Sequence, residues 1–86
     1  IKKNMFKVGK VSHFYDKIKV AVVELSGDLS VGDKIKFVQN GEDLFEQAVD
    51  SIQVEHKKVD HAGNKDVVGL KVDEETKEGT EIYKVS

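Results

Sequence analysis

The chain has 86 residues, 14 of them basic and 16 acidic, with a net charge of −2 and no cysteine, proline or tryptophan. This length predicts one domain that spans residues 1–86, and the absence of cysteine excludes disulfides, thiolate zinc sites and a thiol nucleophile. All the basic residues are lysine, so the chain lacks the planar arginine fork that grips phosphate, and its net charge of −2 provides no broad basic field of the kind typical of a dedicated nucleic-acid-binding protein.

Short runs of alternating apolar and polar residues predict β-strands, and no segment shows the spacing of an amphipathic helix. The six predicted strands are 5–14, 18–25, 34–38, 44–55, 67–72 and 81–85. In the first, the apolar residues change parity near Gly9, which predicts a bulge or a close backbone approach. The second is apolar at both parities, so we expect both of its faces to be at least partly covered.

Turn residues and polar segments predict the connections between these strands. In the glycine-rich connection after the second strand, Leu29 and Val31 are expected to fill the end of the fold. Asn40-Gly41 predicts a tight hairpin, because both residue types tolerate positive φ. The apolar residues of the fourth strand change faces midway, which predicts a bend or bulge. The polar segments 57–66 and 73–79 are expected to be loops.

Six short strands at fairly even spacing predict an all-β domain that forms a small closed or nearly closed β-barrel. Closure would remove the exposed sheet edges from a chain that has no proline to guard them. The longest apolar run, 20–23, is far too short to cross a membrane, and no charged-then-apolar leader opens the chain. We therefore expect a cytoplasmic protein, and the abundance of Lys and Glu favours a thermophilic source.

Several motifs, taken in order along the chain, resemble one known family. They are FKVGKV at 6–11, AVVEL at 21–25, GDLSVGDKI at 27–35, VDSIQ at 49–53, AG at 62–63, VGLKV at 68–72 and GTEIY at 79–83. As an ordered set they resemble the second domain of translation elongation factors of the elongation factor Tu type. The resemblance implies a small closed six-stranded Greek-key-like β-barrel. It also implies a non-catalytic binding module that engages RNA, the ribosome or a protein of the translation machinery.

A second resemblance leads to an alternative function. A related barrel occurs as a C-terminal accessory domain of collagenase-like peptidases, where it is not the catalytic part. By that resemblance the chain would be a protein-interaction or accessory domain of a larger enzyme assembly, with no nucleic-acid role. The sequence contains no G-x-x-x-x-G-K-S/T phosphate loop, so GTP hydrolysis is not available to it. In both interpretations we expect neither enzymatic activity nor a cofactor.

No group of residues forms a pattern typical of catalysis or of metal binding. His56 and His61 lie near Asp60, but their spacing matches no zinc site, and we expect solvated loop histidines. The serines lack the G-x-S-x-G context of a hydrolase nucleophile. Nothing around the acidic run after Val72 indicates the buried pocket that a general acid requires.

Lysines crowd the first half of the chain, beginning with Lys2 and Lys3. Those of the second and third predicted strands would form one basic stripe beside nearby aromatic residues if these strands were neighbours. Basic and aromatic side chains on one barrel face are a common means of binding single-stranded nucleic acid. The predicted contact surface is Lys7, Lys10, Phe14, Tyr15, Lys17, Lys19, Lys34 and Lys36. The alternative is that these lysines only keep the outer face solvated and discourage pairing at sheet edges.

Overall fold

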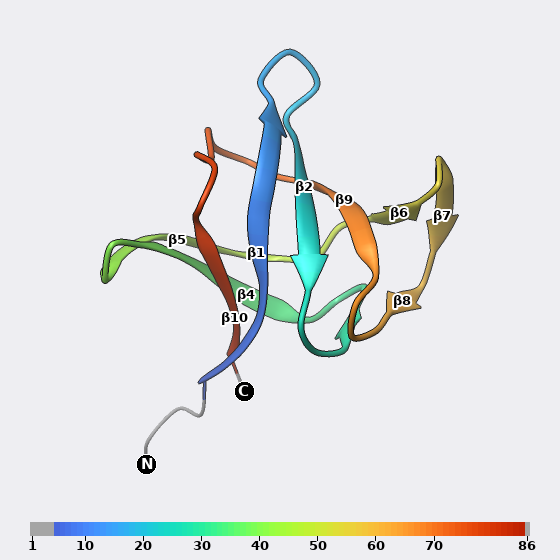
Figure 1. The fold of residues 1–86 in the computed structure, drawn as a ribbon, viewed down its shortest axis with the longest axis horizontal. Coiled ribbons are helices and arrows are strands. Elements are labelled where there is room, and N and C mark those ends of the chain that lie inside the picture. Colours follow the sequence, from blue (N-terminus) through green and yellow to red (C-terminus); the bar gives the residue numbers. More distant parts are fainter. Residues whose placement is uncertain (1–4, 86) are drawn as a thin grey trace.

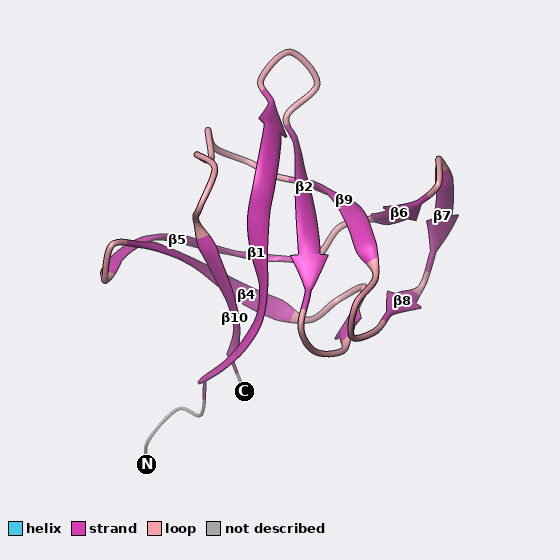
Figure 2. Ribbon diagram, in the orientation of Figure 1, coloured by secondary structure: helices cyan, strands magenta, loops and turns pink. Residues whose placement is uncertain are grey.

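The computed structural model describes residues 5–85, and all of their regular secondary structure is β-strand (Figures 1 and 2). The ten strands in this range are β1 (Met5–Tyr15), β2 (Val20–Leu25), β3 (Leu29–Ser30), β4 (Lys34–Gln39), β5 (Glu42–Ala48), β6 (Ile52–Val54), β7 (Lys57–Val59), β8 (His61–Ala62), β9 (Val67–Lys71) and β10 (Glu81–Val85). The predicted all-β class is confirmed. No helix in the described range is long and apolar enough to cross a membrane.

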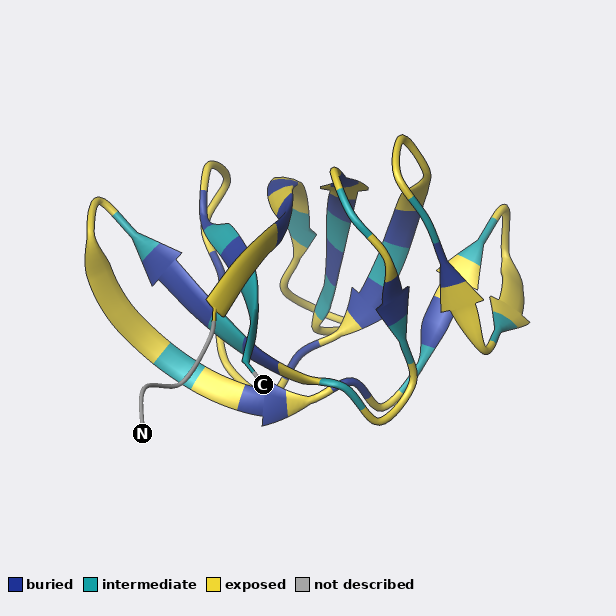
Figure 3. Cartoon of the chain, turned by 90° about the horizontal axis from the view of Figure 1, so that it is seen from below, coloured by how far each residue is buried: buried dark blue, intermediate teal, exposed yellow. Residues whose placement is uncertain are grey.

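Eight of these strands form one antiparallel sheet in the order β5-β4-β10-β1-β2-β9-β6-β7, and β3 pairs with β8. The sheet curves strongly, and buried and exposed segments alternate along its strands (Figure 3). Its hydrogen-bonded ladder does not close, because β5 and β7 are edge strands within residues 5–85. An open, curved sheet of eight strands therefore takes the place of the predicted closed barrel of six.

The predicted fourth strand explains this difference. Its first half is β5, at one end of the sheet beside β4, and its second half is β6, beside β9 near the other end. Between them, Val49 donates a hydrogen bond to the Asp33 carbonyl at 2.8 Å and accepts one from the Gly32 N–H at 2.9 Å. The predicted bend lies in this segment, between the end of β5 at Ala48 and the start of β6 at Ile52. The segment connects the two ends of the sheet without being a strand.

One polar side chain also connects the two ends of the sheet. Gln47 lies on β5 and is only 8% exposed. Its Nε2 donates to the carbonyl of Lys71 at 2.9 Å, and its Oε1 accepts from the N–H of Asp73 at 2.9 Å. These bonds tie edge strand β5 to the chain that leaves β9, which is a connection that strand pairing would provide in a closed barrel.

The core lies on the concave face and follows the predicted alternation. Val68, Leu70 and Val72, which were expected to face together, are 2%, 1% and 1% exposed. Ile52 on β6 pairs with Leu70 on β9 and is fully buried. Leu29 is also fully buried, as predicted, whereas Val31 is 45% exposed, so only one of the two residues expected to fill the end of the fold does so.

The structure confirms the irregularity predicted at Gly9 and the tight hairpin predicted at Asn40-Gly41. The register between β1 and β10 shifts between Lys7 and Gly9, and a Cβ at Gly9 would lie 2.7 Å from Val23 Cγ1. Asn40 and Gly41 have φ angles of 52° and 80° and connect β4 to β5 as a hairpin. By contrast, the predicted loop 57–66 contains β7 and β8, because these short polar strands pair with β6 and β3.

Candidate binding surface

The predicted contact surface falls into three separate groups. Lys7 and Lys10 lie on β1, Lys34 and Lys36 lie on β4, and Lys17 and Lys19 lie in the turn between β1 and β2. Strands β4 and β2 are not neighbours, since β10 and β1 lie between them. The condition for one continuous basic stripe is therefore not met by the strand order. Lys2 and Lys3 lie outside the described residues.

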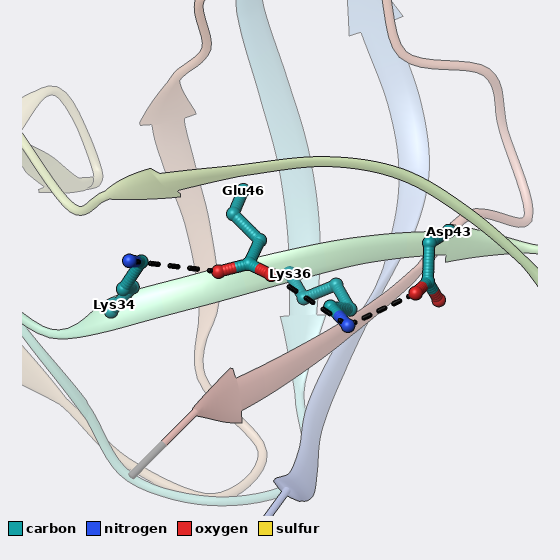
Figure 4. A network of polar contacts seen from close by, with 4 residues as sticks. All are labelled: Lys34, Lys36, Asp43 and Glu46. Atoms are coloured by element: carbon teal, nitrogen blue, oxygen red, sulfur yellow. Dashed lines mark hydrogen bonds and ion pairs between the residues drawn. The ribbon is translucent and has the colours of Figure 1, made fainter. Parts of the chain in front are cut away.

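Three of the predicted contact lysines have carboxylate partners. Lys34 Nζ lies 3.7 Å from Glu46, and Lys36 Nζ lies 3.0 Å from Asp43 and 3.6 Å from Glu46 (Figure 4). The hydrogen bond from Lys36 to Asp43 raises the pKa of Lys36 above its ordinary value. Lys7 Nζ lies 2.7 Å from Glu81. These neighbouring acids reduce the local positive potential on β1 and β4 that would attract a phosphate chain.

The Lys7–Glu81 pair predicts a pH-dependent contribution to stability. The hydrogen bond from Lys7 holds the pKa of Glu81 below its ordinary value, so this contribution is complete above the unfolded-state pKa and disappears as pH falls through the folded-state pKa. Glu81→Gln should cost a small amount of stability at neutral pH, since water screens the partly exposed pair, and nothing in strong acid. Urea unfolding at both pH values tests this. Glu42→Gln is the control, and an equal pH dependence in both variants would contradict the prediction.

The aromatic residues of the predicted surface lie at the β1–β2 hairpin. Phe14 is half-buried and packs against the core, whereas Tyr15 is 50% exposed. The Tyr15 ring stands edge-on to His13 with the ring centroids 4.4 Å apart, and His13 Nδ1 lies 3.3 Å from a carboxylate oxygen of Glu78. Lys10, Lys17 and Lys19 make no ion pair within residues 5–85. A binding role for these residues stays a prediction.

The described residues contain no group of three or more His, Asp or Glu side chains that could hold a metal ion. His56 lies in the turn between β6 and β7, and His61 lies on β8. Each is exposed to solvent.

Two adjoining hollows form a groove on the outer face of the sheet. It runs along β9 between the β1–β2 hairpin and the β6–β7 hairpin, and we call it the β9 groove. Its two parts share four lining residues, Ile18, Val20, Gln53 and Gly69. One part, of about 410 Å³, is mainly apolar, and the other, of about 530 Å³, is mainly polar.

Sequence analysis did not single out this groove, although two signals were present. The second predicted strand is apolar on both faces; in the structure its inner face is buried, whereas the outer Val20 and Val22 are only half-buried. Gly69 lies on the face of β9 opposite to Val68 and Leu70. What the sequence pattern lacks is the register that places Gly69 between Val22 and Gln53.

Comparison with known proteins finds no family model that matches the chain. A Methanocaldococcus jannaschii protein named as an uncharacterised protease is 36% identical over 77 residues. The match covers 90% of this chain but 19% of that relative, so the chain spans about a fifth of the relative's length.

Two solved structures have the same fold as this chain. One is the C-terminal domain of a Geobacillus thermoleovorans protein assigned to the U32 peptidases, with a TM-score of 0.85 and 21% identity over 92% of this chain and 91% of that chain. The other is the selenomethionine variant of that domain, with a TM-score of 0.82 and 20% identity over 88% of this chain and 95% of that chain. At this level of identity the likeness establishes the fold.

These findings correct the predicted family. The resemblance to the second domain of elongation factors was wrong, because the relative is named a protease and the matching structures are peptidase C-terminal domains. The function in translation that the resemblance implied falls with it. The motifs that carried the resemblance are glycine turns and apolar strand positions, which specify a type of β-fold and do not distinguish the proteins that use it.

Proposed function

We propose that this chain is a non-catalytic accessory domain of a larger, protease-like protein and that it serves that protein by binding polypeptide. The observation that carries the proposal is the match to the Methanocaldococcus jannaschii protease, which covers most of this chain and a small part of the relative. A domain that accounts for 19% of a protease leaves most of the length for the catalytic machinery. The fold shared with a peptidase C-terminal domain supports the same interpretation.

The side chains of the described residues also support an accessory role. Residues 5–85 hold no candidate metal cluster, and the sequence has no cysteine and no hydrolase serine motif. Polypeptide is the expected ligand because it is the substrate class of any protease. The β9 groove offers a surface for such a ligand on an otherwise charged domain.

The proposal is tested with the chain and with its Methanocaldococcus jannaschii relative. We expect the 86-residue chain to leave labelled denatured casein uncut. We also expect a form of the relative that lacks the matching segment to be retained less on immobilised denatured casein than the complete relative. Cleavage by the chain alone would contradict the non-catalytic assignment. Equal retention of the two forms of the relative would contradict the role in binding polypeptide.

A further inference from the structure

We propose that the β9 groove binds an extended polypeptide segment that carries alternating apolar side chains followed by a carboxylate. This inference rests on the proposed function and names the surface that performs it. Four features of the groove carry it: its floor, its apolar wall, its charged end and the backbone of its rim.

The floor of the groove lies at Gly69, which has no side chain to fill it. On the outer face, the cross-strand register places Gly69 of β9 between Val22 of β2 and Gln53 of β6. A Cβ at Gly69 would lie 3.3 Å from Val20 Cγ1 and 4.0 Å from Gln53 Cβ, so any side chain there would begin to fill the groove. Outward residues of β9 repeat every second position, and an extended ligand segment has the same period. Its apolar side chains can therefore enter at the spacing of the strand.

The wall beside the β1–β2 hairpin is apolar and exposed. Ile18 is 58% exposed, Val67 is 53% exposed and Tyr15 is 50% exposed, and all three line the groove together with the half-buried Val20 and Val22. Single exposed apolar residues are ordinary, but a contiguous set from three elements around one hollow is typical of an interaction site. These residues favour a ligand with apolar side chains.

The polar end of the groove carries a local excess of positive charge. Lys58 and Lys71 line it, and the one carboxylate among its lining residues is Asp50. Neither lysine makes an ion pair within residues 5–85, in contrast to Lys34 and Lys36 on β4. Lysines without local partners beside an apolar groove favour a ligand with an acidic residue after its apolar stretch.

The rim of the groove has an unusual backbone. Glu55 and His56 form the turn between β6 and β7 with φ angles of 52° and 68°, a left-handed region where a hairpin normally has Asn-Gly. The Asn40-Gly41 turn elsewhere in the chain follows this preference. Both Glu55 and His56 line the apolar half of the groove. Backbone strain of this kind is concentrated at ligand-binding positions, where the side chains matter more than the cost of the turn.

The test measures binding of a labelled synthetic peptide in which valine and threonine alternate before two aspartates. Fluorescence anisotropy with the chain gives the reference affinity. Gly69→Val should weaken binding by about tenfold or more, because the valine side chain occupies the space over residue 69 that the ligand side chain would enter. Val20 must shift by a few tenths of an ångström to admit the new Cβ, so thermal melting of each variant checks that the variant is folded before its affinity is compared. Gly69→Ala should give an intermediate affinity. No binding by the unmodified chain, or equal affinity in Gly69→Val, would overturn the proposal.

Adjacent lysines on β7 provide a matched pair for the charged end. Lys58 pairs with Gln53 and faces the groove, whereas Lys57 is its neighbour on the opposite face of the strand. Lys58→Glu should weaken peptide binding by several fold, and Lys57→Glu should leave it unchanged. Equal effects of the two variants would assign binding to net charge and overturn the proposal. Ile18→Glu and Val31→Glu form a second matched pair, since both residues are exposed and only Ile18 lines the groove. Ile18→Glu should weaken peptide binding, and Val31→Glu should leave it unchanged.

Other occupants are distinguished with the same variants. Tighter binding of a mixed-sequence single-stranded RNA than of the peptide, weakened by Gly69→Val, would assign the groove to nucleic acid. A dimer of the chain that Gly69→Val dissociates in sedimentation would assign it to a second copy. Either result would overturn the proposal. If Gly69→Val has no effect while the shortened relative still loses casein retention, the groove assignment fails and the proposed function stands.

Discussion

Replacing Ile52 with aspartate should unfold the domain. Ile52 is 0% exposed and faces Leu70, which is 1% exposed, across the pairing of β6 with β9. An ionised carboxylate at this position would be buried without a partner. The free-energy cost of moving it out of water adds to the loss of the hydrophobic contact that Ile52 makes. Domains of this kind are stable by only about 5–15 kcal/mol in total, so this penalty is comparable with the whole stability.

The measurement is circular dichroism with thermal melting of the purified variant. Leu70→Asp should behave in the same way, since it places the charge on the other side of the same contact. Gln53→Asp is the matched control, because Gln53 follows Ile52 directly and lies exposed on the outer face. A cooperative melting transition of Ile52→Asp near that of the unmodified chain would show that the inward face of β6 is assigned wrongly.

The inward faces could be predicted because each strand crosses the core with a period of two. The alternation in 67–72 placed Val68 and Leu70 inside and Gly69 outside, as the structure has them. Gly9 and Asn40-Gly41 were predictable from local chemistry, since Asn and Gly tolerate the positive φ of a tight hairpin and a glycine in a strand permits a bulge or a close approach. In these positions the local pattern and the packing require the same structure.

Positions that depend on distant partners were not predictable in this way. β8 is only two residues long and exists because Leu29 and Ala62 lie opposite each other in β3 and β8. The β6–β7 hairpin turns on Glu55 and His56, residue types that carry no hairpin signal. Tertiary pairing overrides local preference in both segments.

The candidate surfaces show the same division. The alternation of Lys34 and Lys36 with apolar residues correctly placed both lysines away from the core, but it carried no information on the neighbouring strands. The carboxylates that pair with them, Asp43 and Glu46, come from β5 across the hairpin. The β9 groove likewise depends on strand order, because Val22, Gly69 and Gln53 belong to three strands that are not consecutive in the chain.

The family resemblance failed for a physical reason. The quoted motifs consist of turn glycines, such as Gly27 and Gly32, and of apolar residues that fill a core. Any chain that folds a similar curved sheet needs such residues at similar spacings, whatever its partner is. Function is carried by surface residues, and the surface of this chain was the part that the motifs did not describe.

Replacing Gln47 with leucine should destabilise the domain by about 2–3 kcal/mol, although leucine is the more hydrophobic residue. The variant removes the hydrogen bonds to the Lys71 carbonyl and from the Asp73 N–H. Both backbone groups would lose their partner at a position where water has only partial access. Chemical denaturation measures the loss, and Gln53→Leu is the control, because Gln53 is an exposed glutamine on the outer face.

Gln47→Glu separates the closing role of these bonds from simple packing, because glutamate has nearly the same shape. An ionised glutamate can still accept from the Asp73 N–H, but it cannot donate to the Lys71 carbonyl and would repel it. Protonation restores the donor, so the folded state should raise the pKa of this carboxyl, and the variant should approach the unmodified chain in stability as pH falls. If Gln47→Glu loses the same stability at every pH, the donor bond to Lys71 does not hold β5 to β9.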